Sequence, residues 1–463
     1  MAEKMQWDRL LNTQPWEDKG KAEDPARPQY VIDADRITFS APFRRLANKT
    51  QVHPLHDNDH LRHRMIHSQE VASVGRTLGT QIGHWLVSEG HLCPGEEHKL
   101  AGIVHAACLA HDIGNPPFGH SGENSIGAWC RENLKAGQGV FNGIGEAKWE
   151  EFCRFEGNAQ GFRILTRLEM YRNEGGMNLS HAALGAFMKY PMGAETSRKI
   201  KGGAEKSGIP KARVKDHIYV GAKKFGFFES EREIFAKSAQ ALGLIEETGP
   251  DGQSWWRRHP LVYLVEAADD ICYNIVDLED GFTAGDLSFD QVVALLDPVA
   301  FKTNRDQSTY TPYEQISYLR ARAIGGAILA CVEAFKANHE AILSGGYSGS
   351  LIASSKKSKE FAAIKDMANE QLFTAPRKTK LEVYGRNVVR EVLHGIRPVF
   401  DALKEQDWNE AKLPEYERQL VRAIHLDLRD IHDSYSALHA MTDYVSGMTD
   451  RYAVEVSKML SGT

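Results

Sequence analysis

Apolar side chains recur every three or four residues through most of this 463-residue chain, whereas the alternation expected of a half-buried strand is scarce. Residues 67–89 show the pattern clearly, with Val71, Val74, Leu78 and Ile82 on one face. A chain patterned in this way buries its core by packing helix against helix. We therefore predict an all-α protein, with helices over residues 67–89, 99–111, 157–172, 179–190, 229–243, 260–280, 312–343, 357–372, 379–404, 414–432 and 434–460.

The length exceeds what one small core requires, so we expect two or three lobes. We expect residues 1–35 to form an irregular N-terminal arm and residues 36–285 to form a helical core. Residues 286–463 should form a C-terminal helical region packed on that core. Within the core, residues 193–224 form a basic insertion with nine Lys and Arg side chains. This insertion is interpreted either as a solvated surface loop or as a mobile basic lid for a phosphate-rich ligand.

Composition excludes several classes of partner. The formal net charge of -6 gives no general attraction to nucleic acid or to an anionic membrane. The longest apolar stretch, residues 323–335, is too short to span a bilayer, and the charged N-terminal sequence does not resemble a signal peptide. The six cysteines form no C-x-x-C pair and predict buried, reduced thiols. We therefore expect a cytoplasmic protein without a membrane partner.

The dipeptide His-Asp, which can bind a divalent metal, occurs three times, as His56-Asp57, His111-Asp112 and His432-Asp433. A surface pair is the simpler interpretation of such a dipeptide, and it is favoured for the last one. The middle dipeptide differs because it ends a helix whose buried face carries Val104 and Cys108. A carboxylate at that depth is costly unless a cation or a strong donor accompanies it, and a metal ion would remove the cost.

Two further side chains complete a candidate ligand set. His67 opens the helix over residues 67–89, where it is either a ligand or an N-terminal core histidine. In the helix over residues 260–280, Asp269 interrupts an apolar stripe, whereas Asp270 falls on a polar face with Glu266, Asn274 and Asp277. Two His and two Asp from three helices would hold one metal and leave positions open for water and substrate.

Nine residues beyond His111 stands His120, followed by Glu123. The intervening Asn-Pro-Pro-Phe-Gly is stiff at its prolines and free at its glycine, so it can fix a turn near the metal. A histidine with a carboxylate partner is typical of general acid–base catalysis. The alternative is a helix cap with an exposed histidine.

Longer strings bring out a family resemblance. The order His67, His111-Asp112, Asp269 is similar to that of the HD superfamily. Between about residues 36 and 282 the chain resembles the deoxynucleoside triphosphate triphosphohydrolases, the dGTPase group, in the strings RRLANKTQVHPL, HRMIHSQEVASVGR, LAHDIGNPPFGHSGE, FEGNAQGFRIL, FMKYP, KFGFFESE and YLVEAADDICYNIVDLEDG. The C-terminal third offers no string that aligns residue by residue.

The resemblance implies an HD-domain helical core with additional N- and C-terminal helices. It implies hydrolysis of a dNTP, with dGTP as the expected substrate, to the deoxynucleoside and inorganic triphosphate by water attack at the α-phosphorus. It also implies a divalent metal (Mn or Mg, with Zn, Co, Ni or Fe as alternatives) and a second Mg with the triphosphate. By carry-over, the metal ligands would be His67, His111, Asp112 and Asp269.

The resemblance assigns the remaining roles as follows. His120 would act on the 5′ leaving oxygen or the attacking water, with Glu123 orienting it. The phosphates would contact Arg64, Lys189 and Tyr190, the deoxyribose would contact Tyr273 and Asp277, and the base would approach Gln51, with Asn115 and Asn158 nearby.

Two other functions stay open on the sequence. One is an HD phosphodiesterase or 5′-nucleotidase, against which the long strings argue. The other is a regulatory protein that responds to nucleotides or single-stranded DNA. The family also implies a homo-oligomer, for which we expect a hexamer, and a single-stranded DNA or dNTP effector.

Overall fold

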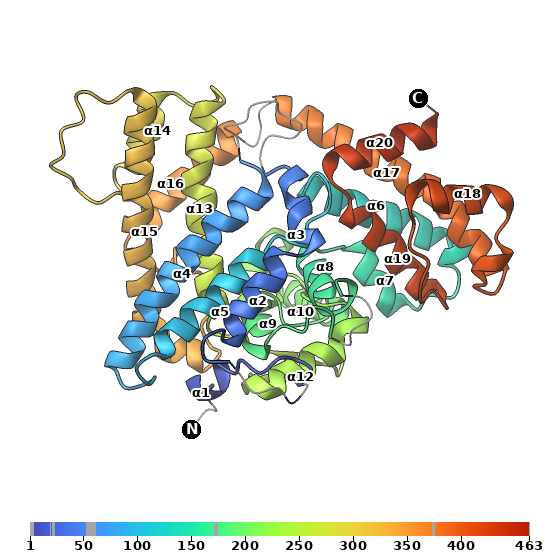
Figure 1. The fold of residues 1–463 in the computed structure, drawn as a ribbon, viewed down its shortest axis with the longest axis horizontal. Helices are drawn as coiled ribbons and strands as arrows, with labels where there is room; N and C mark the ends of the chain where they lie inside the picture. The colour runs from blue at the N-terminus through green and yellow to red at the C-terminus, as the bar shows by residue number, and fades with distance from the viewer. Residues whose placement is uncertain are drawn as a thin grey trace.

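The computed structural model describes residues 4–18, 20, 24–51, 62–170, 175–372 and 376–462. Over these residues the backbone forms 20 α-helices and one two-stranded sheet, which confirms the all-α prediction (Figure 1). The strands, β1 (Glu246–Thr248) and β2 (Ser254–Trp256), pair antiparallel. No helix in the described part of the chain is long and apolar enough to cross a membrane. The dipeptide His56-Asp57 lies outside the described residues.

A first apolar core is built around helices α4, α5, α13 and α15, which lie together in the left half of Figure 1. Its helices extend from the N-terminus to residue 372. They are α1 (Trp7–Leu10), α2 (Gln29–Thr38), α3 (Ala41–Arg45), α4 (Arg64–Ser88), α5 (Glu96–Ala110), α9 (His181–Phe187), α12 (Arg232–Leu242), α13 (Val262–Thr283), α14 (Phe289–Leu296), α15 (Pro312–Leu343) and α16 (Ser358–Met367).

Three glycines let α5 lie directly against α4. Gly75, Gly79 and Gly83 are spaced by four residues, so they share one face of α4. A Cβ atom at Gly79 would lie 2.9 Å from the Cα atom of Ala101, and one at Gly83 would lie 2.7 Å from the Cα atom of Glu97. Because any larger side chain would push the helices apart, this spacing fixes the N-terminal turn of α4 beside the C-terminal end of α5.

A second apolar core joins the segment after the HD dipeptide to the C-terminal helices, in the right half of Figure 1. It contains α6 (His120–Ala136), α7 (Glu146–Cys153), α17 (Pro376–Glu405), α18 (Glu415–Ile424), α19 (Ser434–Gly447) and α20 (Asp450–Ser461). Ile113 belongs to the first core and Phe118 to the second. The chain therefore passes from one core to the other inside the loop that follows His111-Asp112.

Some expected elements differ from those observed. The single helix expected over 434–460 is divided at Met448, because the Thr449 side chain caps α20 by accepting a hydrogen bond from the Tyr452 backbone N–H. The basic stretch 193–224 is not an irregular loop, since it contains α10 (Ala194–Lys206) and α11 (Val214–His217). The N-terminal arm is shorter than expected, because α2 already begins at Gln29. The remaining helix, α8 (Gly157–Arg163), continues into a π-helical turn over Ile164–Leu168.

Candidate metal centre and its cavity

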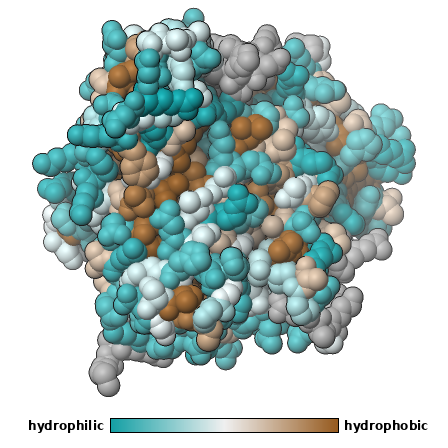
Figure 2. Space-filling model, turned by 60° about the vertical axis from the view of Figure 1, so that its left-hand side comes forward, coloured by the Kyte–Doolittle hydropathy of each residue, from teal (hydrophilic) through white to brown (hydrophobic). Residues whose placement is uncertain are grey.

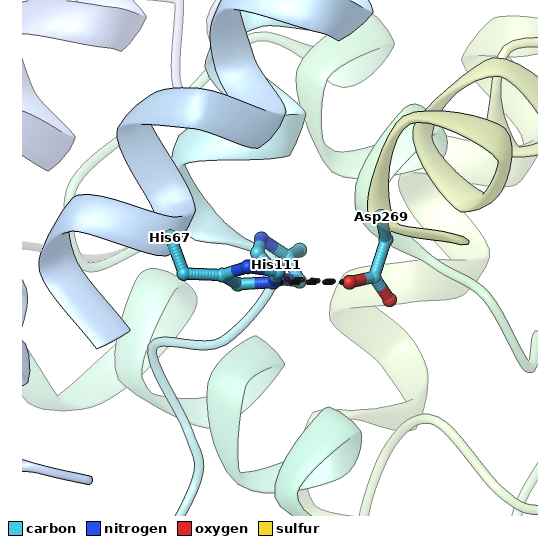
Figure 3. Close-up of side chains that lie close together, drawn as sticks. All are labelled: His67, His111 and Asp269. Atoms are coloured by element: carbon cyan, nitrogen blue, oxygen red, sulfur yellow. Dashed lines mark hydrogen bonds and ion pairs between the residues drawn. The ribbon is translucent and has the colours of Figure 1, made fainter. Parts of the chain in front are cut away.

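Three side chains from different helices of the first core converge on one point (Figure 3). His67 lies in the first turn of α4, His111 caps the C-terminal end of α5, and Asp269 lies in the middle of α13. The His67 Nε2 atom is 3.1 Å from Asp269 Oδ1, and the His111 Nε2 atom is 3.6 Å from the same oxygen. One donor atom from each residue lies within 4.8 Å of the others.

The hydrogen bonds of His111 leave a lone pair for a cation. Its Nδ1 atom lies 2.7 Å from the Cys108 carbonyl oxygen, which can only accept, so the ring proton belongs on Nδ1. The Nε2 atom is buried and has no hydrogen-bond partner among the described residues. A metal-binding histidine typically has this arrangement, with one ring nitrogen held by a carbonyl and the other facing the ion. The residues present therefore fit a divalent metal.

Electrostatics support the same conclusion. Burial disfavours ionisation of Asp269, but the charges of His111 and His67 and a hydrogen bond from His67 keep its pKa below the ordinary value. Burial likewise lowers the pKa of His67, and the Asp269 carboxylate reverses that effect and raises it. A bound cation would take the place of the His67 proton, since a metal ligand must be deprotonated.

Asp112 lies beside this cluster and has other partners. Its Oδ1 atom is 3.6 Å from His111 Nε2. Arg64 donates to its Oδ2 atom at 2.6 Å, and the Asn115 side-chain amide donates to its Oδ1 atom. Burial opposes its ionisation, and the charges of Arg64, His111 and His67 together more than compensate, so the pKa is lowered to about 2. Asp112 is thus a charged neighbour of the three converging side chains, and its place as a fourth ligand stays a prediction.

A cavity of about 400 Å³ opens beside the cluster. Among the described residues, His67 and Asp277 are the two predicted site residues that do not line it; Asp277 is buried two turns beyond Asp269 on α13. The cavity brings together the other predicted residues, which are Gln51, Arg64, His111, Asp112, Asn115, His120, Glu123, Asn158, Lys189, Tyr190, Asp269 and Tyr273.

Three long cationic side chains line this cavity, and each pairs with a carboxylate. Arg64 pairs with Asp112, Lys189 Nζ lies 3.3 Å from Glu266, and Lys224 donates to Glu156 at 2.7 Å. Burial lowers the pKa of Lys189, but Tyr190 and the carboxylates of Glu266, Asp269 and Asp270 outweigh burial and raise its pKa above the ordinary value. The cavity therefore offers three cationic side chains that a polyanionic ligand could contact, beside carboxylates that a bound cation would offset.

His120 and Glu123 lie in the first turn of α6, at the other end of the loop that begins after His111. His120 is exposed, and Glu123 is buried. The expected hydrogen bond between them is not formed: within the described residues, Glu123 accepts instead from the Gly157 backbone N–H at 2.7 Å. The structure therefore brings both to the cavity without the orienting contact that the sequence suggested.

The adjacent carboxylates of α13 differ as periodicity predicted. Asp269 contacts His67, whereas Asp270 lines the cavity without belonging to the cluster of His67, His111 and Asp269. Burial, together with the charges of Glu266 and Asp269, raises the pKa of Asp270 to about 7.

Sequence reasoning missed Lys224, Glu266 and Glu382 as cavity residues. Lys224 stood in the basic stretch 193–224, so its charge was visible but its contact with the site was not. Glu266 lies one turn before Asp269 on the face predicted to be polar, and it anchors both Lys189 and the buried Arg258.

Comparisons with known proteins agree with this geometry. The HD domain family matches residues 64–172, and the phosphohydrolase-associated domain matches residues 351–459. The first match spans His67 and His111, and the second spans α17 to α19 and nearly all of α20.

Full-length relatives extend the comparison. The chain is 37% identical to the deoxyguanosinetriphosphate triphosphohydrolase-like proteins of Synechocystis sp. and Pseudomonas aeruginosa, over 99% of each chain. It is 30% identical to the deoxyguanosinetriphosphate triphosphohydrolase of Yersinia enterocolitica over 96% of each chain. With an HD domain, a His and Asp cluster and relatives along its whole length, this chain belongs to the deoxyguanosinetriphosphate triphosphohydrolase-like family of HD hydrolases.

Proposed function

We propose that this protein hydrolyses deoxynucleoside triphosphates, with dGTP as the first candidate, to the deoxynucleoside and inorganic triphosphate. One observation carries the proposal. The cluster of His67, His111 and Asp269 adjoins a cavity that also holds Arg64 and Lys189. Metal ligands beside cationic side chains suit hydrolysis of a phosphate ester in which the phosphoryl portion under attack is highly charged.

His67, His111 and Asp269 would hold the divalent ion, with Asp112 as the fourth ligand. Mn and Mg are the first choices, and Zn, Co, Ni and Fe also accept this donor set. When bound, the ion would supply Lewis-acid stabilisation and a water of lowered pKa. A second Mg would accompany the triphosphate.

The protein's own groups would divide the remaining work. A triphosphate carries about four negative charges, which Arg64 and Lys189 would neutralise in part, together with the bound metal and with Tyr190 beside them. A water oxygen would bond to the α-phosphorus while the bond from that phosphorus to the 5′-oxygen breaks. His120 would hold the proton that reaches the 5′-oxygen, because it is the exposed histidine of the cavity.

Residues farther along the cavity would select the nucleoside. Tyr273 is exposed at the cavity wall, where its ring would pack against the deoxyribose and leave no room for a 2′-hydroxyl group. Asp277 would bind the 3′-hydroxyl group, and Gln51 would approach the base. Asn115 and Asn158 would complete the surroundings of the substrate.

The test identifies the phosphate product. The purified protein is incubated with each dNTP and with Mn or Mg, and phosphates are separated by ion-exchange chromatography. We expect inorganic triphosphate and the deoxynucleoside in equal amounts, and no product from Asp269→Asn. Orthophosphate or pyrophosphate without triphosphate would overturn the proposal and indicate an HD phosphodiesterase or 5′-nucleotidase.

We also propose a homo-oligomer, a hexamer being the expected form, whose activity responds to single-stranded DNA or a second dNTP. On the face drawn in Figure 2, apolar side chains gather in a band flanked by hydrophilic ones, as at surfaces that associate. Large apolar side chains of α15 and the preceding loop are exposed, among them Phe301, Tyr313 and Leu329. Light scattering of the purified protein, with and without these effectors, measures the assembly.

A further inference from the structure

The backbone immediately before His120 adopts an unfavourable conformation. Phe118 has a φ of 62° and Gly119 a φ of 57°. The left-handed region suits glycine, but it is strained for a phenylalanine. This strained turn is also where the chain crosses between the two apolar cores. The position of His120 therefore depends on contacts that hold the turn from outside.

A single buried carboxylate supplies those contacts. Asp450, the first residue of α20, is 2% exposed. Its Oδ1 atom accepts a hydrogen bond from the Phe118 backbone N–H at 3.0 Å. Its Oδ2 atom accepts two from Thr50, the backbone N–H at 3.1 Å and the hydroxyl at 2.6 Å. Thr50 and Phe118 both line the cavity, so one side chain of the second core ties two segments of its wall.

Lys49 makes a second tie at the same place. This lysine is 3% exposed, and its Nζ atom donates to the carbonyl oxygens of Asn115 at 2.6 Å and Ser446 at 2.7 Å. Its own carbonyl oxygen accepts from the Arg64 backbone N–H, where α4 begins. Lys49 thus ties Asn115, near the start of the loop after His111, to Ser446 of α19. Asp450 of α20 binds Phe118, near the end of that loop.

We propose that Asp450, assisted by Lys49, is a positioning residue through which the C-terminal core sets the place of His120 relative to the metal ligands. The inference deepens the proposed function and rests on it for its kinetic consequence. Of the proposed metal ligands, His67, His111 and Asp269 lie on or at the end of helices of the first core, and the contacts of Asp450 are with Thr50 and Phe118 rather than with these three residues. Loss of this contact should lower turnover and leave metal binding intact.

The test compares Asp450→Asn with a matched control. In Asp450→Asn, the side-chain NH₂ group of the new asparagine must face either the Phe118 backbone N–H or the Thr50 backbone N–H. Two hydrogen-bond donors then oppose each other at one of these positions. The control is Asp443→Asn on α19, because Asp443 also bridges to the first core, through Arg163 and Gln160, without contacting the loop. Each variant therefore removes the charge of one buried or half-buried carboxylate that bridges distant segments. Only Asp450 contacts the turn before His120.

We expect Asp450→Asn to lower kcat by about 100-fold, the effect of displacing a catalytic group by about 1 Å, with KM changed by less than about threefold. Mn affinity, measured by titration with the metal alone, should stay within about threefold of wild type. Hydrogen exchange at residues 113–119 should accelerate in Asp450→Asn and not in Asp443→Asn. If Asp450→Asn does not fold, Lys49→Met takes its place with the same expectations.

The outcomes separate this inference from the proposed function. If wild-type protein releases no triphosphate, the proposed function fails, and hydrogen exchange with Mn titration still tests the positioning. Unchanged exchange in the loop of Asp450→Asn would overturn the inference. So would equal losses of kcat in Asp450→Asn and Asp443→Asn, because the effect would then be general to contacts between the cores.

Discussion

Asp269 and Asp270 are adjacent carboxylates of α13 that line the same cavity, so their amide variants test the metal site with the smallest change of shape. Only Asp269 contacts His67 and His111. We expect Asp269→Asn to lose metal affinity and Asp270→Asn to keep it. The substitutions preserve volume, and both positions lie in the middle of a long helix.

The magnitude follows from what each carboxylate contributes. Groups that only orient a metal ligand are worth about 10–100-fold in metal affinity. A direct ligand should therefore be worth at least about 100-fold, which is about 2.7 kcal/mol. Burial and its acidic neighbours hold the pKa of Asp270 near 7, so at neutral pH the metal-free protein carries only part of a charge there. We therefore expect Asp270→Asn to lower the metal affinity by less than about tenfold.

Isothermal titration of the metal-free variants with Mn at pH 7 measures both affinities, and circular dichroism in EDTA checks that each variant folds. An unchanged affinity in Asp269→Asn would show that this carboxylate is not a ligand. Equal losses in the two variants would refute the argument from helix periodicity, because the effect would then reflect net charge in the cavity.

Three further predictions concern separate parts of the molecule. His120→Ala should retain Mn and lose turnover by about 10²–10⁴-fold, and normal turnover would assign the proton transfer to another group. Tyr273→Ala should hydrolyse ribonucleoside triphosphates better relative to dNTPs; unchanged selectivity in a competition assay would exclude the sugar contact. Burial raises the pKa of Glu151 to about 8, above its ordinary value of 4.5. Because the folded state then holds a proton that the unfolded state releases, wild-type stability should fall between those pH values by about 1.4 kcal/mol per pH unit relative to Glu151→Gln. Urea unfolding at pH 5 to 8 measures this difference, and parallel curves for the two proteins would refute it.

The sequence predicted those parts of the site that follow from helix periodicity. Asp269 was chosen over Asp270 because it interrupts an apolar stripe, and the structure places it against His67. A buried face that runs into His111 predicts it as a ligand, and its Nε2 atom, which has no hydrogen-bond partner among the described residues, agrees with that reasoning. Both arguments depend on residues within one or two turns of each other, which is the range that periodicity covers.

The remaining features depend on contacts between distant residues. Asp450 meets Phe118 across 332 positions of the chain, and nothing near Asp450 in the sequence signals that contact. Periodicity placed Glu266 on a polar face, but the pattern of one helix does not reveal that Arg258 and Lys189 lie against it. The break at Met448 had a local signal in the capping Thr449, but continuous helical spacing on both sides obscured it.

The passage of the chain between two cores inside one loop affects how preparations of this protein should be judged. The candidate metal ligands His67, His111 and Asp269 lie on or at the end of helices of the first core, whereas His120 begins α6, whose apolar face packs in the second. If the second core loosens first during storage or heating, the ion would stay bound while turnover stops. Metal content would then overstate the active fraction, and titration of the active sites would be the proper measure of concentration.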